Sequence, residues 1–99
     1  LDVDQDPLGK PAVRVKKDGD VEVWSRPLED GSLAVGFFNR GEGTRTVNVA
    51  WKDLGIDGPR IVRDLWRQKD IGSKAFESSF EGLVGRHGVL FVRLRLVQS

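Results

Sequence analysis

Few side chains in this chain could carry acid–base or nucleophilic chemistry. There are 15 aspartates and glutamates, one histidine and no cysteine. Paired-carboxylate catalysis needs two acids roughly 5 to 9.5 Å apart across a cleft, and Asp64 is the carboxylate set among apolar strand residues. Its neighbour Arg63 favours an ion pair over catalysis. His87 has no neighbouring pattern for a triad or a zinc site. We therefore expect it in a turn and predict no catalytic residue.

Metal, cofactor and nucleic-acid binding find no support either. The absence of cysteine excludes a disulfide framework and a thiolate metal site. Neither a Gly-x-Gly-x-x-Gly nor a Gly-x-x-x-x-Gly-Lys-Ser/Thr motif occurs. Sixteen basic residues nearly balance the acids, and their signs alternate along the chain instead of forming the basic face that nucleic acid requires. No apolar run is long enough for a membrane span. We predict no metal, cofactor, nucleic acid or membrane partner.

The three tryptophans are the remaining candidates for binding. An indole face stacks on the C–H face of a sugar ring, but in an all-β domain tryptophan more often fills a core or an interface. We favour the core or interface interpretation for Trp24, Trp51 and Trp66. Trp66 is the best exception, because it stands at a strand exit beside Arg67 and other polar residues. Sugar contact through Trp24 and Trp66 stays open.

These side chains would be positioned by a β-hairpin over residues 21–43. Asp30-Gly31 lies between two extended apolar runs and supplies the positive φ of a tight turn. A two-residue turn would pair Leu28 with Leu33, Arg26 with Val35 and Trp24 with Phe37. Pro27 lacks an amide proton, so its strand must be an edge or be bulged near that point.

The remaining pattern predicts an all-β fold. Val13 and Val15 alternate with polar residues and predict a strand with both valines inward. Val47, Val49 and Trp51 predict a second such strand, followed by a single helical turn that ends at Gly55. Further strands are expected over 60–66, over 75–83 and over 90–96. The last carries Leu90, Val92, Leu94 and Leu96 on one face and supplies the core wall opposite the hairpin. The count gives seven or eight antiparallel strands in a two-sheet β-sandwich of Greek-key type.

The run 33–38 is apolar at every position, which is typical of a strand buried on both faces. A chain of 99 residues has little left to cover the second face. It forms one sandwich domain over 12–99, after a proline-rich and acidic linker over 1–11. The chain starts at Leu1 without Met, so we expect a piece of a longer protein. An apolar patch should be exposed on it.

Four motifs in order resemble the end of an α-galactosidase of glycoside hydrolase family 27. They are Gln-Asp-Pro-Leu-Gly-Lys at 5–10, Val-Trp-Ser-Arg-Pro-Leu-x-Asp-Gly-Ser-Leu-Ala-Val-Gly-x-Phe-Asn-Arg-Gly at 23–41, Val-Arg-Asp-Leu-Trp-Arg-Gln-Lys-Asp at 62–70 and His-Gly-Val at 87–89. In that family a catalytic (β/α)₈ barrel precedes a C-terminal β-sandwich. No position here matches the family's two catalytic aspartates. Asp4 stands where the family pattern has Asn.

The resemblance implies a non-catalytic C-terminal module that packs on and stabilises the barrel of the same parent chain. The parent would then be a secreted retaining glycosidase. The residues expected at the interdomain interface are Asp6, Pro7, Leu8, Trp66 and Arg67. Arg26 and Arg40, together with Arg67, are expected to anchor polar contacts at turns.

Two alternatives stay open. One is a carbohydrate-binding module that contacts galactosides through exposed tryptophan. The other is an unrelated immunoglobulin-like scaffold, against which stands the lack of a Cys-Trp-Cys arrangement.

Overall fold

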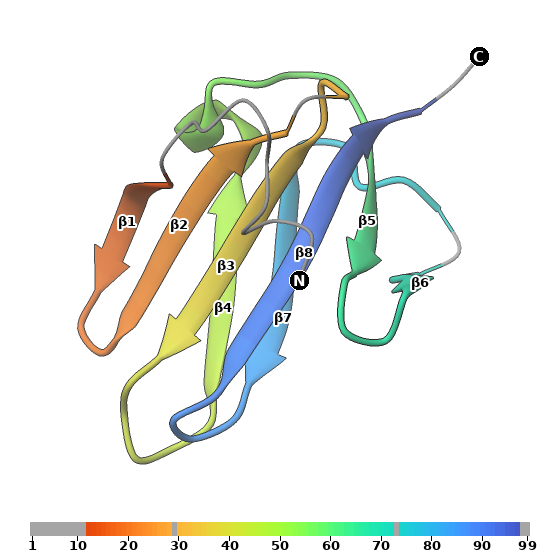
Figure 1. The fold of residues 1–99 in the computed structure, drawn as a ribbon. Coiled ribbons are helices and arrows are strands. Elements are labelled where there is room, and N and C mark those ends of the chain that lie inside the picture. The colour runs from red at the N-terminus through yellow and green to blue at the C-terminus, as the bar shows by residue number, and fades with distance from the viewer. Residues whose placement is uncertain (1–11, 29, 73, 98–99) are drawn as a thin grey trace.

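The chain forms a β-sandwich of two unequal sheets (Figure 1). The computed structural model describes residues 12–28, 30–72 and 74–97. Within these ranges the large sheet has six antiparallel strands in the spatial order β1-β2-β3-β8-β5-β6. These are β1 (Val13–Asp18), β2 (Val21–Pro27), β3 (Leu33–Asn39), β8 (Val89–Leu96), β5 (Arg60–Asp64) and β6 (Lys69–Asp70).

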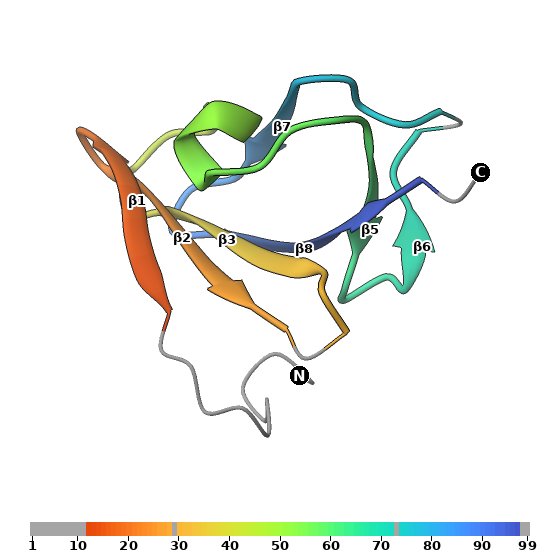
Figure 2. The same cartoon turned by 90° about the horizontal axis from the view of Figure 1, so that it is seen from above.

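The small sheet pairs β4 (Arg45–Ala50) with β7 (Ser79–Val84). Figure 2 shows this sheet and the 3-10 helix η2 (Trp51–Leu54) lying over one face of the large sheet. The two-sheet antiparallel fold expected from the sequence is thereby confirmed. The other face of β2, β3 and β8 has neither of them over it.

The core fills the space between the two layers. Phe37 of β3 is fully buried and meets Phe80 of β7 with ring centroids 5.6 Å apart. Trp51 is 2 % exposed, as the alternation of β4 predicts. The aliphatic core residues come from both layers: Val21, Val23, Val35, Val47, Val49, Val62, Val84, Val92 and Leu94. Inward residues recur at every second position of the long strands because successive side chains point to opposite faces.

The predicted register of the β2–β3 hairpin is wrong by one residue. Trp24 lies opposite Gly36, not Phe37, and Pro27 lies opposite Leu33. The turn is longer than two residues, since the Leu28 amide donates to the Ser32 carbonyl oxygen over 2.9 Å. A slip of one residue exchanges the two faces of a strand. Phe37 therefore enters the core while Trp24 points outward.

The predicted place of the last strand is also wrong. β8 does not oppose the hairpin but hydrogen-bonds beside β3 in the same sheet, with Val35 opposite Val92. Its inward residues Val92 and Leu94 belong to the same core cluster as residues of β4 and β7. Leu96 was expected inward, yet it is 59 % exposed at the end of β8.

Several boundaries differ from the sequence prediction. β5 ends at Asp64, so Trp66 belongs to a turn. β7 begins only at Ser79, while Phe76 makes an isolated bridge to Arg60. Val13 is 59 % exposed although it was expected inward, and the β1–β2 register shifts between Arg14 and Lys16.

Two local predictions are confirmed. Gly55 ends the single helical turn in the left-handed conformation, at φ 72°. The pairing of β2 with β1 stops at Ser25, so the missing amide proton of Pro27 leaves no gap in that ladder.

Candidate functional site

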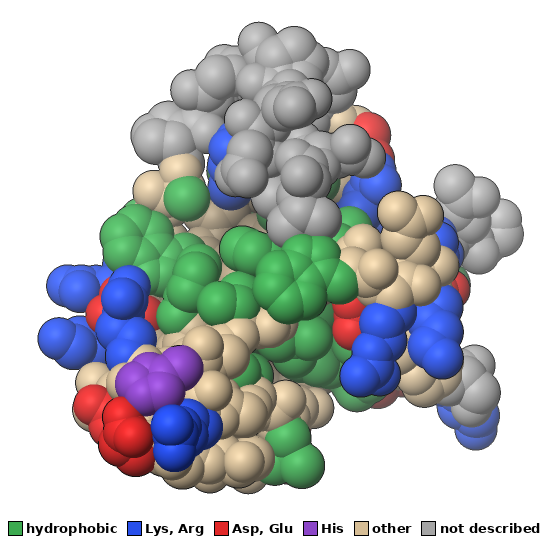
Figure 3. Space-filling view, turned by 60° about the horizontal axis from the view of Figure 1, so that its bottom comes forward, with side chains coloured by type: hydrophobic (Ala, Val, Ile, Leu, Met, Phe, Trp, Pro, Cys, Tyr) green, Lys and Arg blue, Asp and Glu red, His purple; other side chains and the backbone are tan. Residues whose placement is uncertain are grey.

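The outer face of the large sheet carries an aromatic surface. Trp24, Gly36 and Phe91 form one row across β2, β3 and β8, and Phe38 follows Gly36 on the same face. In Figure 3 hydrophobic side chains gather on this face between charged margins. The outer face of the small sheet is different, because Thr46, Asn48 and Glu81 are exposed there. We call the first surface, made by Trp24, Ala34, Gly36, Phe38, Phe91 and Trp66, the aromatic face.

A groove of about 210 Å³ opens in the aromatic face. Phe38 and Phe91 meet edge to face above Gly36, with centroids 5.7 Å apart and an interplanar angle of 90°. A Cβ atom on Gly36 would lie 2.8 Å from Cε1 of Phe91 and 3.0 Å from Cε1 of Phe38. Only glycine lets both rings approach the strand this closely. The groove is lined by Ala12, Trp24, Ser25, Arg26, Ala34, Val35, Gly36, Phe38 and Phe91.

Trp24 is held in place at one side of the groove. Its indole N–H donates to Oε1 of Glu22 over 3.0 Å, and Nε of Arg40 donates to Oε2 of the same carboxylate over 3.2 Å. The bond from Trp24 lowers the pKa of Glu22 below 4.5, and the charges of Arg40 and Arg14 act in the same direction. The carboxylate is thereby kept ionised and fixes the indole on the surface. Arg40 thus links the start of the β3–β4 loop to β2.

Trp66 stands at the other side of the aromatic face. It is 58 % exposed, and its indole meets the edge of Phe91 with centroids 5.8 Å apart. Oδ1 of Asp64 accepts the backbone amides of Trp66 and Arg67 over 2.9 and 3.0 Å, and Arg67 pairs with the same carboxylate at 3.9 Å. Asp64 forms an ion pair as expected, but with Arg67, whereas the adjacent Arg63 pairs with Asp70. Its carboxylate builds the turn that presents Trp66.

Arginines line one margin of this sheet face. Arg63 of β5 lies directly opposite Arg93 of β8, an arrangement that destabilises a sheet unless the charges are compensated. Arg93 pairs with Asp30 and donates through Nε to the Ser32 hydroxyl over 2.9 Å. Arg63 pairs with Asp70 at 3.4 Å. The margin is therefore a polar rim around an apolar centre.

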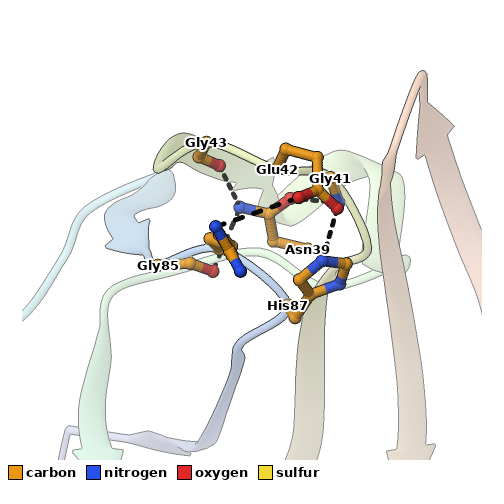
Figure 4. A network of polar contacts seen from close by, with 7 residues as sticks. Asn39, Gly41, Glu42, Gly43, Gly85 and His87 are labelled. Carbon is orange, nitrogen blue, oxygen red and sulfur yellow. Dashed lines mark hydrogen bonds and ion pairs between the residues drawn. The ribbon is translucent and has the colours of Figure 1, made fainter.

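A polar cluster joins the β3–β4 and β7–β8 loops, which connect the two sheets at one end of the sandwich (Figure 4). Asn39 is 2 % exposed, and its side-chain amide donates to the carbonyl oxygens of Gly43, Val84 and Gly85 over 2.8, 3.0 and 3.1 Å. Its Oδ1 accepts the amide of Gly41 over 2.9 Å. The cluster is saturated by backbone groups, so Asn39 ties the loops together.

His87 lies in the β7–β8 turn with φ 52°, as the sequence predicted for a turn residue. Its Nε2 is 2.6 Å from Oε2 of Glu42, and both side chains are more than half exposed. Among residues 12–28, 30–72 and 74–97, no group of three or more His, Cys, Asp or Glu side chains could hold a metal ion. No helix in the described part is long and apolar enough to cross a membrane.

Comparison with known proteins decides the family. A family profile described as "Alpha galactosidase C-terminal beta sandwich domain" matches residues 18–94. The chain belongs to this family. It is 44 % identical over 66 residues to an α-galactosidase of Coffea arabica, covering 65 % of this chain and 18 % of that protein. It is 33 % identical over 90 residues to α-galactosidase 3 of Arabidopsis thaliana, covering 86 % and 20 %.

Solved structures agree on the fold of this α-galactosidase C-terminal domain. α-Galactosidase I of Mortierella vinacea superposes with a TM-score of 0.86 at 28 % identity, over 95 % of this chain and 25 % of that one. A β-L-arabinopyranosidase of glycoside hydrolase family 27 from Geobacillus stearothermophilus gives 0.82 at 30 % identity, over 89 % and 20 %. The domain spans about a fifth of the length of these relatives.

The domain brings together some of the residues singled out from sequence. Trp24 and Trp66 both lie on the aromatic face, with Phe91 between them, and Arg67 is beside Trp66. Asp6, Pro7 and Leu8 lie outside the described residues. Sequence reasoning missed Phe38 and Phe91, although the uninterrupted apolar run 33–38 was a signal for the first.

Replacing Asn39 tests the loop cluster. In Asn39→Ala three buried carbonyl groups and one amide lose their partner, so the free energy of unfolding should fall by about 2–4 kcal/mol. Asn48→Ala, at an exposed position of the small sheet, is the matched control and should change it by less than about 0.5 kcal/mol. Urea unfolding followed by tryptophan fluorescence measures both. Equal effects would show that Asn39 does not hold the loops.

Proposed function

We propose that this domain is a non-catalytic part of an α-galactosidase-like glycoside hydrolase and packs through its aromatic face on the enzyme's catalytic barrel. One observation carries the proposal: the two outer faces of the sandwich are unlike. The face of β4 and β7 exposes Thr46, Asn48 and Glu81 beside one leucine, Leu83, whereas that of β2, β3 and β8 is apolar and aromatic. Large apolar patches rimmed by polar groups mark interaction surfaces on soluble domains.

The composition of the aromatic face suits a protein partner. Interface centres are enriched in aromatic side chains, and arginine is the charged residue that interfaces favour. Trp24 and Trp66 supply large rings, and Arg63 and Arg93 stand at the margin. The residues 1–11, which contain Asp6, Pro7 and Leu8, would form the seam between the barrel and the sandwich domain over 12–99. Trp66 and Arg67 would border that seam.

The absence of catalysis is part of the proposal. The carboxylate of Asp64 accepts hydrogen bonds from two backbone amides and forms an ion pair with Arg67. These contacts give it a structural role in the turn. His87 is exposed and faces Glu42 at a loop. Activity and export would both belong to the longer protein, whose relatives are named α-galactosidases.

Removing the exposed indole of Trp66 tests the docking. Trp66→Ser should lower the free energy of unfolding of the longer protein by about 1–3 kcal/mol, because an interface aromatic loses its contacts. It should change that of the 99-residue chain by less than about 0.5 kcal/mol, because the indole is largely exposed there. Glu81→Gln, at an exposed position of the small sheet, is the control and should affect neither. Equal loss in both proteins, or none in either, would contradict docking.

A second candidate is carbohydrate binding at Trp66. An open hollow of about 290 Å³ is lined by Trp66, Arg67 and Asp64 together with residues on both sides of the β7–β8 turn, and an indole beside polar groups suits a sugar.

Titration with galactose and with melibiose separates the two candidates. Packing on a barrel predicts no saturable change in the tryptophan fluorescence of the 99-residue chain. A saturable change that is lost in Trp66→Phe would favour the carbohydrate-binding module. The same samples should release no product from an aryl α-galactoside, and turnover lost in Asp64→Asn would contradict a non-catalytic role.

A further inference from the structure

An aspartate precedes a glycine at three places in the chain: Asp18-Gly19, Asp30-Gly31 and Asp57-Gly58. The backbone nitrogen that follows an aspartate can attack the side-chain carboxyl carbon and close a five-membered imide ring. Glycine favours this step because it has no Cβ to restrict the backbone or to shield that nitrogen. Ring closure also needs a carboxyl group that is free to turn toward the backbone. The three pairs differ in this respect.

Two of the three aspartates are held in hairpin turns. Oδ1 of Asp30 accepts the backbone amide of Ser32 over 2.9 Å, and its Oδ2 pairs with Arg93. The glycine after Asp30 donates its own amide to a carbonyl oxygen within the turn. Asp18 ends β1 in the ladder with β2 and pairs with Arg45 at 3.8 Å. Attack on either carboxyl group would break contacts that hold a turn.

Asp57 is less constrained, because it lies in the segment 55–59 between η2 and β5. Asp57 and Gly58 are both exposed, and a Cβ atom on Gly58 would have no atom within 4 Å. Among the described residues, none binds the Asp57 carboxylate and none accepts a hydrogen bond from the Gly58 amide. The carboxyl group and the nitrogen that would attack it are therefore both available.

Arg60 lies next to the carbonyl group at which such a ring would open. It is 7 % exposed, and its Nη2 donates to the main-chain carbonyl oxygen of Asp57 over 3.1 Å. Its Nε is buried without a hydrogen-bond partner. A carbonyl group that a cationic donor polarises is stabilised as negative charge develops on its oxygen, so water adds there more readily. The resulting carboxylate would gain a charge-assisted hydrogen bond, about twice as strong as a neutral one.

We propose that Asp57-Gly58 is a site of spontaneous isomerisation to isoaspartate and that Arg60 directs the reaction to this product. The Gly58 nitrogen bonds to Cγ of the protonated Asp57 carboxyl group, and one water molecule leaves. Water then adds to the main-chain carbonyl carbon of Asp57, the bond from that carbon to the Gly58 nitrogen breaks, and the nitrogen regains a proton. The chain now continues through Cγ, and the freed α-carboxylate faces Arg60. This goes beyond the proposed function, because none of these residues belongs to the aromatic face.

Ageing of the folded 99-residue chain at mildly acidic pH tests the site. Trypsin places Asp57 in the peptide 53–60 and the other two Asp-Gly pairs in the peptide 18–40, since the bond before Pro27 resists cleavage. Isoaspartate, detected by enzymatic methylation of its α-carboxylate, should accumulate several-fold faster in 53–60. Equal accumulation in the two peptides, or faster accumulation in 18–40, would overturn the proposal.

The same chain aged in urea is the matched control. The difference between the two peptides should disappear there, because no turn holds Asp18 or Asp30 in the unfolded chain. A difference of the same size in urea would trace the reactivity to local sequence and contradict the proposal. Asp57→Glu would have to close a six-membered ring, so the signal of 53–60 should vanish although Asp53 remains in that peptide.

Ageing in H₂¹⁸O tests the part played by Arg60. Hydrolysis of the imide leaves ¹⁸O in both the isoaspartate and the aspartate that form, so the two labelled forms of 53–60 give the ratio of ring openings. This ratio should be higher in the folded chain than in urea. Arg60→Lys keeps the charge but lacks the planar donor fork, and should lower the ratio without stopping ring closure. An equal ratio in the folded and the urea-treated chain would show that Arg60 does not direct the opening.

Discussion

The close approach of two phenyl rings to Gly36 is the contact on which the outer surface depends. β3 is the central strand between β2 and β8, and its two faces are buried for different reasons. Val35 and Phe37 point into the core, while Gly36 lies beneath the rings of Phe38 and Phe91 on the outer face. Any larger residue at Gly36 would push Phe91 and Phe38 off the strand. The groove exists because that position has no side chain.

The different sizes of the two sheets explain why the aromatic face is left uncovered by the small sheet. A two-stranded sheet and η2 cover one face of a six-stranded sheet, and the opposite face has neither of them over it. Apolar area left in water costs free energy roughly in proportion to its size. A surface on which Glu22 and Arg40 fix Trp24, and Asp64 fixes the turn of Trp66, is also rigid before binding. Rigid aromatic groups lose little conformational entropy when a partner arrives.

Local patterns in the sequence predicted the fold class and most of the core. Alternation placed Val47, Val49 and Trp51 in the core, and the glycine after them ended a single helical turn. The run 33–38 indicated burial on both faces before any strand order was known. Asp64 was correctly interpreted as an ion-pair residue, although its partner is Arg67 and not the adjacent Arg63.

Features that depend on contacts between distant parts of the chain could not be predicted from the sequence. Whether Asp30-Gly31 closes a two-residue or a longer turn depends on which backbone groups hydrogen-bond around it. That difference alone changes the cross-strand partner of Trp24 from Phe37 to Gly36. An alternating strand such as β8 reads the same whether it lies beside the hairpin or across from it. Phe91 joined the candidate surface only once the neighbour of β8 was known.

Hydroxyl-radical footprinting compares the surface of the 99-residue chain with that of the same residues in the longer protein. The central claim is that the aromatic face is covered by the barrel. It predicts that Trp66 and Phe91 are modified in the isolated chain and protected in the longer protein, while Leu54 of η2, on the side of the small sheet, is modified equally in both. Equal modification of Trp66 in the two proteins, or protection of Leu54 in its place, would contradict the claim.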